Sequence, residues 1–307
     1  MTKAIYAATA EYEAEIKQLP VKRRVSVSGI LYHLGVSRSG YHAWKKRVPS
    51  DTQKRREKIM HKIREIYDES HQNYGAPKIT RELKKAGFHA SEKTIGNYMR
   101  DMGIKAQWVK PFTHTTIDSD FSNKLQNILD EKFNPDSPNA VWVSDITYIW
   151  TFEGFVYLTS IMDLYSRKII SWVLSDTLEA SSVVKAVEKA KAERTITQPL
   201  VLHSDRGSQY VSEAFRNATA GMINSYSQKA YPWDNACIES FHALIKREWL
   251  NRFKIFSRNH AYRLVFEYIE TFYNTVRIHS HCGYLSPNQY EAEYLSKMEE
   301  NAMALAS

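Results

Sequence analysis

Three acidic residues, far apart in the sequence, have the types and settings needed for metal-dependent chemistry. Asp145 lies in the segment AVWVSDITYIW, Asp205 in QPLVLHSDRGSQY and Glu239 in NACIESFHALIKREWL. Carboxylates bind Mg²⁺ or Mn²⁺ while leaving coordination positions open for phosphate and water. Two such ions, about 3.5–4 Å apart, activate water and stabilise the leaving oxygen in phosphodiester cleavage. We therefore expect these three side chains to converge and to hold two divalent ions.

Each of the three acids also has a simpler explanation. Asp145 could be a structural acid that is paired with a base, Asp205 a turn residue, and Glu239 a charge on the protein surface. The convergent reading is favoured because the three residues together meet one chemical need, whereas the simpler readings are unrelated to one another.

The segment around Asp145 is predicted to be a strand, because every second residue of a strand points to the same face and the segment shows this alternation. Val141, Val143, Asp145, Thr147 and Ile149 alternate in this way. A carboxylate on an otherwise apolar face needs a partner or a metal if it is buried. The β-rich runs that follow predict two more strands, which together form a three-stranded meander.

A strand and a helix are predicted to position the other two acids. Residues 179–195 have the pattern of an amphipathic helix, and the short apolar run after them predicts a central strand that ends near Asp205. Asp234 is predicted to cap the next helix, which carries Glu239, His242 and Lys246 on one face. Lys246 would then lie about 10 Å along the helix from Glu239.

Charge divides the chain into two unequal parts. The net charge is +8, but residues 1–116 hold 23 Lys and Arg against 11 Asp and Glu, a net of +12, and the remainder carries a net of −4. A basic part joined to a mildly acidic part indicates that the basic part binds polyanions; a solvated lysine-rich surface is the alternative.

Composition excludes several classes of protein. The apolar content of 43% with 25% charged residues is that of a globular protein and excludes wholesale disorder. No run approaches the roughly 18 apolar residues of a membrane span, and the N-terminus lacks an apolar signal core. Two cysteines cannot form a disulfide framework. We expect a protein of a reducing compartment, with no membrane partner.

The basic part contains two candidate helix-turn-helix units. In residues 25–47, Gly35 separates two short helical patterns, and the second presents Arg38, His42, Lys45 and Lys46. An ordinary helical hairpin is the alternative for this stretch. In the second unit, after a charged amphipathic run, Ser91 is predicted to cap a helix with Lys93 in its first turn. Two such units favour DNA, because a helix fits its major groove.

Four motifs of the acidic part, in their order along the chain, resemble the DDE transposases of the insertion sequence 3 family, whose core is that of the retroviral integrases. The motifs are WVSDITYI, HSDRGSQY, DNACIESFHALIKRE and YNTVRIHSHCGYLSPNQYE. The basic segments GVSRSGYHAW and YGAPKITRELKKAGFHASEKTI resemble the helical pieces that precede this core in the family's second reading frame. The resemblance implies an α/β fold, with a ribonuclease-H-like mixed sheet flanked by helices and preceded by all-α helix-turn-helix units.

The resemblance also implies a division into domains. We expect a first helix-turn-helix-like unit in 1–50, a second in 51–110, a linker in 111–137, the catalytic core in 138–292 and a helical tail in 293–307. The chain departs from the family in one respect. Only 33 residues separate Asp205 from Glu239, about two fewer than usual, and we expect the shortening in 212–222.

The function implied by the resemblance is that of a DNA transposase. The family's metal-binding and catalytic triad maps onto Asp145, Asp205 and Glu239, and its basic residue near the terminal DNA maps onto Lys246. Two Mg²⁺ or Mn²⁺ ions would serve cleavage at the element ends and strand transfer by a 3′ hydroxyl. The basic residues expected to contact DNA are Arg38, Lys45, Lys46, Lys93 and Lys246.

The resemblance implies partners and a location as well. We expect double-stranded DNA, as element terminal repeats and as target, the product of an upstream reading frame or a fusion with it, and a homo-oligomer on DNA. The expected location is the bacterial cytoplasm, at the nucleoid. Two alternatives remain open: a catalytically silent DNA-binding regulator of transposition, and a ribonuclease-H-like structure-selective nuclease.

A few other polar residues have more than one interpretation. Asp163 is expected to order a turn with Ser166 or Arg167 rather than to bind metal, and His203 to be a packed neighbour of the site. His242 could contact DNA or be exposed. The remaining group, expected to fasten the C-terminal segment to the core, comprises Asn274, Arg277 and His279.

Overall fold

The computed structural model describes residues 2–16, 25–107, 125–228 and 232–306. It divides into two compact units, Met1–Lys62 and Ile63–Ser307. Most of the predicted linker, residues 111–124, lies outside the described residues.

The first unit contains three short helices around a small aromatic core. Tyr6 from the first helix packs with Leu31 and Tyr41 of the other two. Ser26 and Ser37 begin two of the helices, and each side chain accepts a backbone N–H three residues later, as an N-cap does. The predicted helical pair is present, with an additional helix before it. The elements are α1 (Thr2–Ile16), α2 (Val27–His33) and α3 (Arg38–Lys45).

A second group of helices follows along the chain. The helix α4 (Asp51–Glu69) runs across the boundary between the two units, and α5 (Ala76–Lys85) and α6 (Glu92–Asp101) belong to the second. Ser91 caps α6, as predicted, by accepting the N–H of Thr94. The buried side chains Ile79, Leu83, Ile95 and Met99 lie on α5 and α6.

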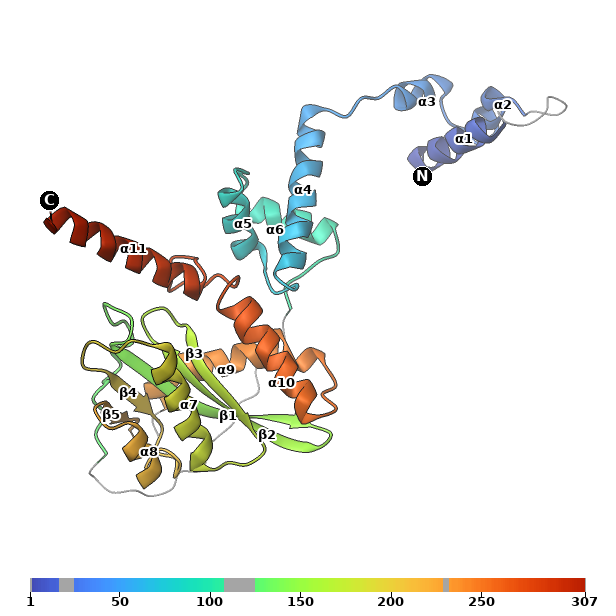
Figure 1. The fold of residues 1–307 in the computed structure, drawn as a ribbon. Coiled ribbons are helices and arrows are strands. Elements are labelled where there is room, and N and C mark those ends of the chain that lie inside the picture. The colour runs from blue at the N-terminus through green and yellow to red at the C-terminus, as the bar shows by residue number, and fades with distance from the viewer. Residues whose placement is uncertain (1, 17–24, 108–124, 229–231, 307) are drawn as a thin grey trace. The chain divides into compact units, whose positions relative to one another are not determined.

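A mixed five-stranded sheet forms the centre of the second unit (Figure 1). Its strand order is β3-β2-β1-β4-β5, with antiparallel pairing among β1, β2 and β3 and parallel pairing of β4 with β1 and β5. The predicted meander and the predicted strand before Asp205 are confirmed. The strands are β1 (Val141–Thr151), β2 (Gly154–Asp163), β3 (Ile169–Ser175), β4 (Val201–Ser204) and β5 (Ile223–Tyr226).

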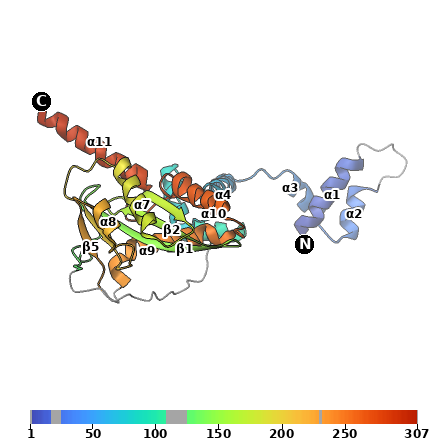
Figure 2. The same cartoon turned by 60° about the horizontal axis from the view of Figure 1, so that its bottom comes forward.

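Helices cover the sheet on both faces (Figure 2). Trp142 of β1 packs in one cluster with Val183 and Val187 of α7 (Ala180–Glu193). Asp145 has the opposite parity on β1 and contacts α9 (Ala236–Glu248) through its side chain. Because side chains alternate along a strand, α7 and α9 lie on opposite faces.

The remaining elements complete the second unit. They are α8 (Glu213–Ala218), the short 3₁₀ helices η1 (Pro232–Asn235) and η2 (Leu250–Arg252), α10 (Arg258–Phe266), a π-helical segment η3 (Glu267–Tyr273) and α11 (Pro287–Ala306). The predicted fold class, a mixed sheet flanked by helices and preceded by helical units, is confirmed. Within the described ranges, no helix is both long and apolar enough to cross a membrane.

The predicted start of α9 is wrong by one residue. Asn235, not Asp234, precedes the helix, and its side chain makes no capping hydrogen bond. Asp234 lies in η1 and its Oδ2 accepts the backbone N–H of Gln228 at 2.6 Å. The carboxylate expected to cap α9 is therefore used to hold the preceding segment.

Candidate active site

Asp145 and Asp205 lie side by side at one end of the parallel strands. The pairing of β1 with β4 aligns Ser144 with Ser204, and each aspartate is the next residue of its chain segment. Neighbouring strands are about 4.8 Å apart, and residues in register share a face. The two residues therefore lie next to each other where the parallel pairing ends, Asp145 inside β1 and Asp205 directly after β4, as the strand pattern predicted for Asp205.

Glu239 reaches these two aspartates from the first turn of α9. Its pKa is raised from 4.5 to about 7, chiefly because the carboxyl is partly removed from water and further because Asp145 and Asp205 are negatively charged. The side chain still has a solvent-exposed part. An electrostatic effect from both aspartates requires proximity, so the fold brings the three predicted acids together.

Tyr210 lies close to both aspartates from inside the core. Its ring is buried, and its hydroxyl is 2.9 Å from Ser144 Oγ. Burial raises the pKa of this phenol well above its ordinary value, and the charges of Asp145 and Asp205 raise it further. Sequence reasoning missed this residue, because Tyr210 carries no mark that distinguishes it from an ordinary core aromatic.

The turn after β4 holds the Asp205 side chain. The backbone N–H of Gly207 donates to Asp205 Oδ1 at 2.9 Å. A Cβ atom at position 207 would lie 3.1 Å from the same oxygen and 2.9 Å from Gln209 Oε1, which is too close for an unperturbed turn. A side chain at position 207 would therefore require Gln209 and the Asp205 carboxylate to shift.

His242 does not occupy either of the two positions considered for it. It is neither exposed nor on a DNA-facing surface, since only 4% of the residue is accessible. Its Nδ1 lies 3.2 Å from Asp145 Oδ2, and its Nε2 lies 3.2 Å from Ser160 Oγ. The signal available in the sequence was its spacing of three residues from Glu239, which places both on one side of α9.

Lys246 lies on the same side of α9, further from Glu239. Its Nζ is 4.6 Å from the centre of the Tyr148 ring. Partial burial lowers the pKa of this ammonium, and the negative charge of Asp145 opposes that shift. Because the charge of Asp145 affects the Lys246 ammonium, Lys246 lies near the acidic site, as its spacing of seven residues from Glu239 on the helix predicted.

The side chains of the acidic site are of the type that binds divalent cations, but they are not close enough together to coordinate one ion. Within the ranges that the structure describes, no three His, Cys, Asp or Glu side chains are grouped closely enough to hold one metal ion. The donors are carboxylate oxygens, which Mg²⁺ and Mn²⁺ prefer. Burial is the main cause of the raised pKa of Glu239, the charges of Asp145 and Asp205 add to it, and a bound cation would offset the effect of those charges.

The other basic residues expected to contact DNA lie apart from the acidic site in sequence. Arg38 is the first residue of α3, and Lys46 directly follows that helix; both are exposed. Lys45 Nζ lies 2.6 Å from Glu13 Oε2 of α1, so it also joins two helices. Lys93 is exposed in the first turn of α6.

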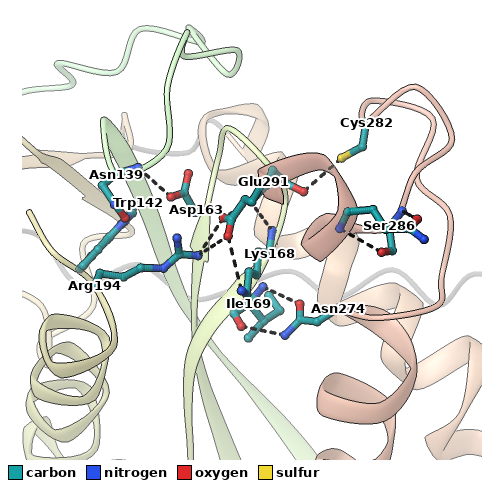
Figure 3. Close-up of polar contacts among 12 residues, drawn as sticks. Asn139, Trp142, Asp163, Lys168, Ile169, Arg194, Asn274, Cys282, Ser286 and Glu291 are labelled. Carbon is teal, nitrogen blue, oxygen red and sulfur yellow. Dashed lines mark hydrogen bonds and ion pairs between the residues drawn. The ribbon is translucent and has the colours of Figure 1, made fainter. Parts of the chain in front are cut away.

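Four further residues have structural roles, and two of them, Asp163 and Asn274, are labelled in Figure 3. Asp163 accepts the N–H groups of Asn139 and Tyr165, so it orders the turn as expected, though not through Ser166 or Arg167. His203 is buried against Ser225 and Ser227. Asn274 and Arg277 attach the C-terminal segment to the core, as predicted. The Asn274 amide accepts the backbone N–H of Ile169 and donates to its carbonyl, and Arg277 donates to Glu248.

Comparisons with known proteins find two kinds of domain in this chain. Two models described as an integrase core domain match residues 135–227 and 220–287, and a model described as an HTH-like domain matches residues 54–112. The intasome of simian T-cell lymphotropic virus in complex with PP2A regulatory subunit B56 gamma is 15% identical, with a TM-score of 0.43 over 75% of this chain and 74% of that chain.

Two bacterial relatives match most of the chain. The transposase InsF for insertion sequence IS3A of Escherichia coli (strain K12) is 34% identical over 275 residues, 88% of this chain and 96% of the relative. The transposase for insertion sequence element IS904 of Lactococcus lactis subsp. lactis is 35% identical over 247 residues, 80% of this chain and 98% of the relative. On this similarity, the chain belongs to the insertion sequence 3 family of DDE transposases.

Proposed function

We propose that this transposase cuts DNA at the ends of its insertion element and joins the freed 3′ hydroxyl to target DNA. In this proposal Asp145, Asp205 and Glu239 hold two Mg²⁺ or Mn²⁺ ions. The observation that supports it best is that three carboxylates, from β1, the end of β4 and α9, lie near one another, close enough for the charges of Asp145 and Asp205 to add to the effect of burial on the pKa of Glu239.

The roles of the residues follow from how firmly each is held. Divalent ions, when bound, supply an activated water or hydroxyl nucleophile and stabilise the leaving oxygen. Asp145 and Asp205 are fixed by the sheet and by the Gly207 turn, so they form the rigid side of the site. Glu239 is exposed at the start of a helix and would provide the third carboxylate to the ions. Lys246 orients the terminal DNA through a phosphate contact.

The DNA partners follow from charge and fold. The basic residues Arg38, Lys45, Lys46 and Lys93 contact phosphates of the element ends and target. The first three lie on or directly after α3, and Lys93 lies on α6, within the segment that matches an HTH-like domain. The active species is an oligomer that pairs two ends, and the product of an upstream reading frame, separate or fused, takes part in it.

The test is a strand-transfer assay on labelled oligonucleotides that carry the element's ends. Asp145→Asn, Asp205→Asn and Glu239→Gln should each abolish cleavage and joining, because each removes one charge that the ions need. DNA affinity should stay within about twofold of the wild type, since phosphate contacts supply most of it. Glu188→Gln, an exposed acid on α7, is the matched control.

The same assay separates the alternatives. A structure-selective nuclease would cut without joining, and a silent regulator would bind without cutting. Full activity in any one of the three variants would remove that residue from the proposed site.

A further inference from the structure

A buried histidine connects the proposed metal site to the second strand of the sheet. In the antiparallel pairing of β1 with β2, Asp145 lies directly opposite Ser160. Residues opposite each other on neighbouring strands point to the same face. His242, one helical turn after Glu239 on α9, lies over this pair and is within 3.2 Å of both Asp145 Oδ2 and Ser160 Oγ.

The partners of the imidazole assign its protons. An ionised carboxylate can only accept, so the nitrogen that faces Asp145, Nδ1, carries the hydrogen and donates it. In the neutral ring Nε2 is then an acceptor, and Ser160 Oγ–H donates to it. In an imidazolium both nitrogens donate instead, and in either form the ring joins Ser160 to Asp145 with Nδ1–H donating to the carboxylate.

This series of hydrogen bonds is shielded from water at its inner end. Ser160 is fully buried and His242 is 4% exposed, whereas 18% of the Asp145 side chain is exposed. Water therefore competes little for the two inner groups, and the hydrogen bond to Oδ2 restricts how the carboxylate can rotate. Partners that hold a ligating carboxylate in this way contribute to metal affinity even though they do not touch the metal.

We propose that His242 is a positioning residue that holds the Asp145 carboxylate, through Oδ2, in the orientation needed to bind a divalent ion, with Ser160 fixing the imidazole. The inference rests on the proposed function, because it presumes that Asp145 is a metal ligand. A histidine that only filled core space would be replaceable by another ring of similar size with no effect on metal binding.

The experiment measures Mn²⁺ binding to the full chain without DNA, by the electron paramagnetic resonance signal of free Mn²⁺. His242→Phe keeps an aromatic ring but removes both hydrogen bonds, and it should weaken the dissociation constant about 10- to 100-fold. His242→Asn retains an N–H that can reach Asp145, and it should recover most of the affinity. Ser160→Ala, a smaller change in volume, should weaken binding by a lesser factor in the same direction.

Two controls make the result decisive. Lys189→Ala, an exposed change on α7, should bind Mn²⁺ like the wild type, and circular dichroism should show that each variant keeps its secondary structure. Unchanged or tighter Mn²⁺ binding by both His242→Phe and Ser160→Ala, while Asp145→Asn loses binding, would overturn the positioning role alone. Undiminished binding by Asp145→Asn would overturn the metal site itself, and this inference with it.

Discussion

Among the single residues of the site, Glu239 has a carboxyl pKa that differs strongly from its ordinary value. Its carboxyl has a pKa of about 7 in the fold against an ordinary 4.5, so the folded protein holds this proton more tightly than the unfolded chain does. The contribution of Glu239 to the free energy of unfolding therefore falls as pH rises from about 4.5 to about 7. Above pH 7, with no cation bound nearby, the ionised Glu239 therefore lowers the free energy of unfolding.

This linkage predicts that Glu239→Gln stabilises the metal-free protein at pH 8. The variant removes a carboxylate that is partly buried and lies near the charges of Asp145 and Asp205, so it should melt at a higher temperature than the wild type in EDTA. Near pH 4, where the carboxyl is protonated in both states, the difference should vanish. Thermal melts at the two pH values, with Glu188→Gln as control, measure this; a pH-independent difference would contradict it.

Residue types and spacing were enough to predict where the three acids and Lys246 lie: Asp145 on a strand, Asp205 at the end of a strand, and Glu239 with Lys246 on one helix. Their roles in binding metal and DNA stay predictions. His242 could not be placed in this way. Its environment depends on the register that sets Asp145 opposite Ser160, and no local pattern specifies register between two strands.

At the scale of elements, α9 links the acidic site to the C-terminal part of the core. Glu239 lies in its first turn and Glu248 is its last residue. Burial alone would raise the pKa of Glu248, but the hydrogen bonds and charge of Arg277 outweigh burial and lower it. Arg277 Nε and Nη2 bind the two carboxylate oxygens of Glu248 at 2.7 Å each, with both side chains almost fully buried.

This buried pair predicts a large loss on removal of one partner. Arg277→Met leaves Glu248 as an uncompensated buried charge, and it should lower the free energy of unfolding by about 3–5 kcal/mol. Arg258→Met breaks an exposed ion pair with Asp176 and should change the free energy of unfolding by about 1 kcal/mol or less. Urea denaturation followed by circular dichroism measures both. Equal effects from the two variants would show that the buried pair does not anchor α9.

The elements themselves were largely predictable from periodicity. The three strands of the meander, α7 and α9 each show a local apolar pattern, and the structure contains all of them. The start of α9 was not predictable, because Asp234 is held by the backbone of Gln228 rather than by the helix. A tertiary contact decided between two acceptable N-terminal residues, Asp234 and Asn235.

Charge is the property that matters most at the scale of the whole molecule. The net charge of +12 in residues 1–116 contrasts with the acids of the proposed site, so we expect DNA affinity and catalysis to reside mainly in different parts of the chain. The order of the strands, by contrast, is a property of the whole fold. The family resemblance implied a mixed sheet, but no local pattern predicted the order of its strands.

This distribution of charge predicts how DNA binding responds to salt. The logarithm of the association constant should fall linearly with the logarithm of salt concentration, and Arg38→Ala or Lys93→Ala should each reduce the slope by about one if the side chain contacts a phosphate. Lys189→Ala on α7 should leave it unchanged. Fluorescence anisotropy at several salt concentrations measures the slopes, and an unaltered slope would exclude that residue from the DNA interface.

The most direct measurement is the anomalous X-ray scattering of crystals soaked in Mn²⁺. The account predicts two peaks about 3.5–4 Å apart, bounded by the carboxylates of Asp145, Asp205 and Glu239. It also predicts that both peaks are lost in crystals of Asp145→Asn. Peaks elsewhere on the molecule, with none among these three side chains, would contradict it.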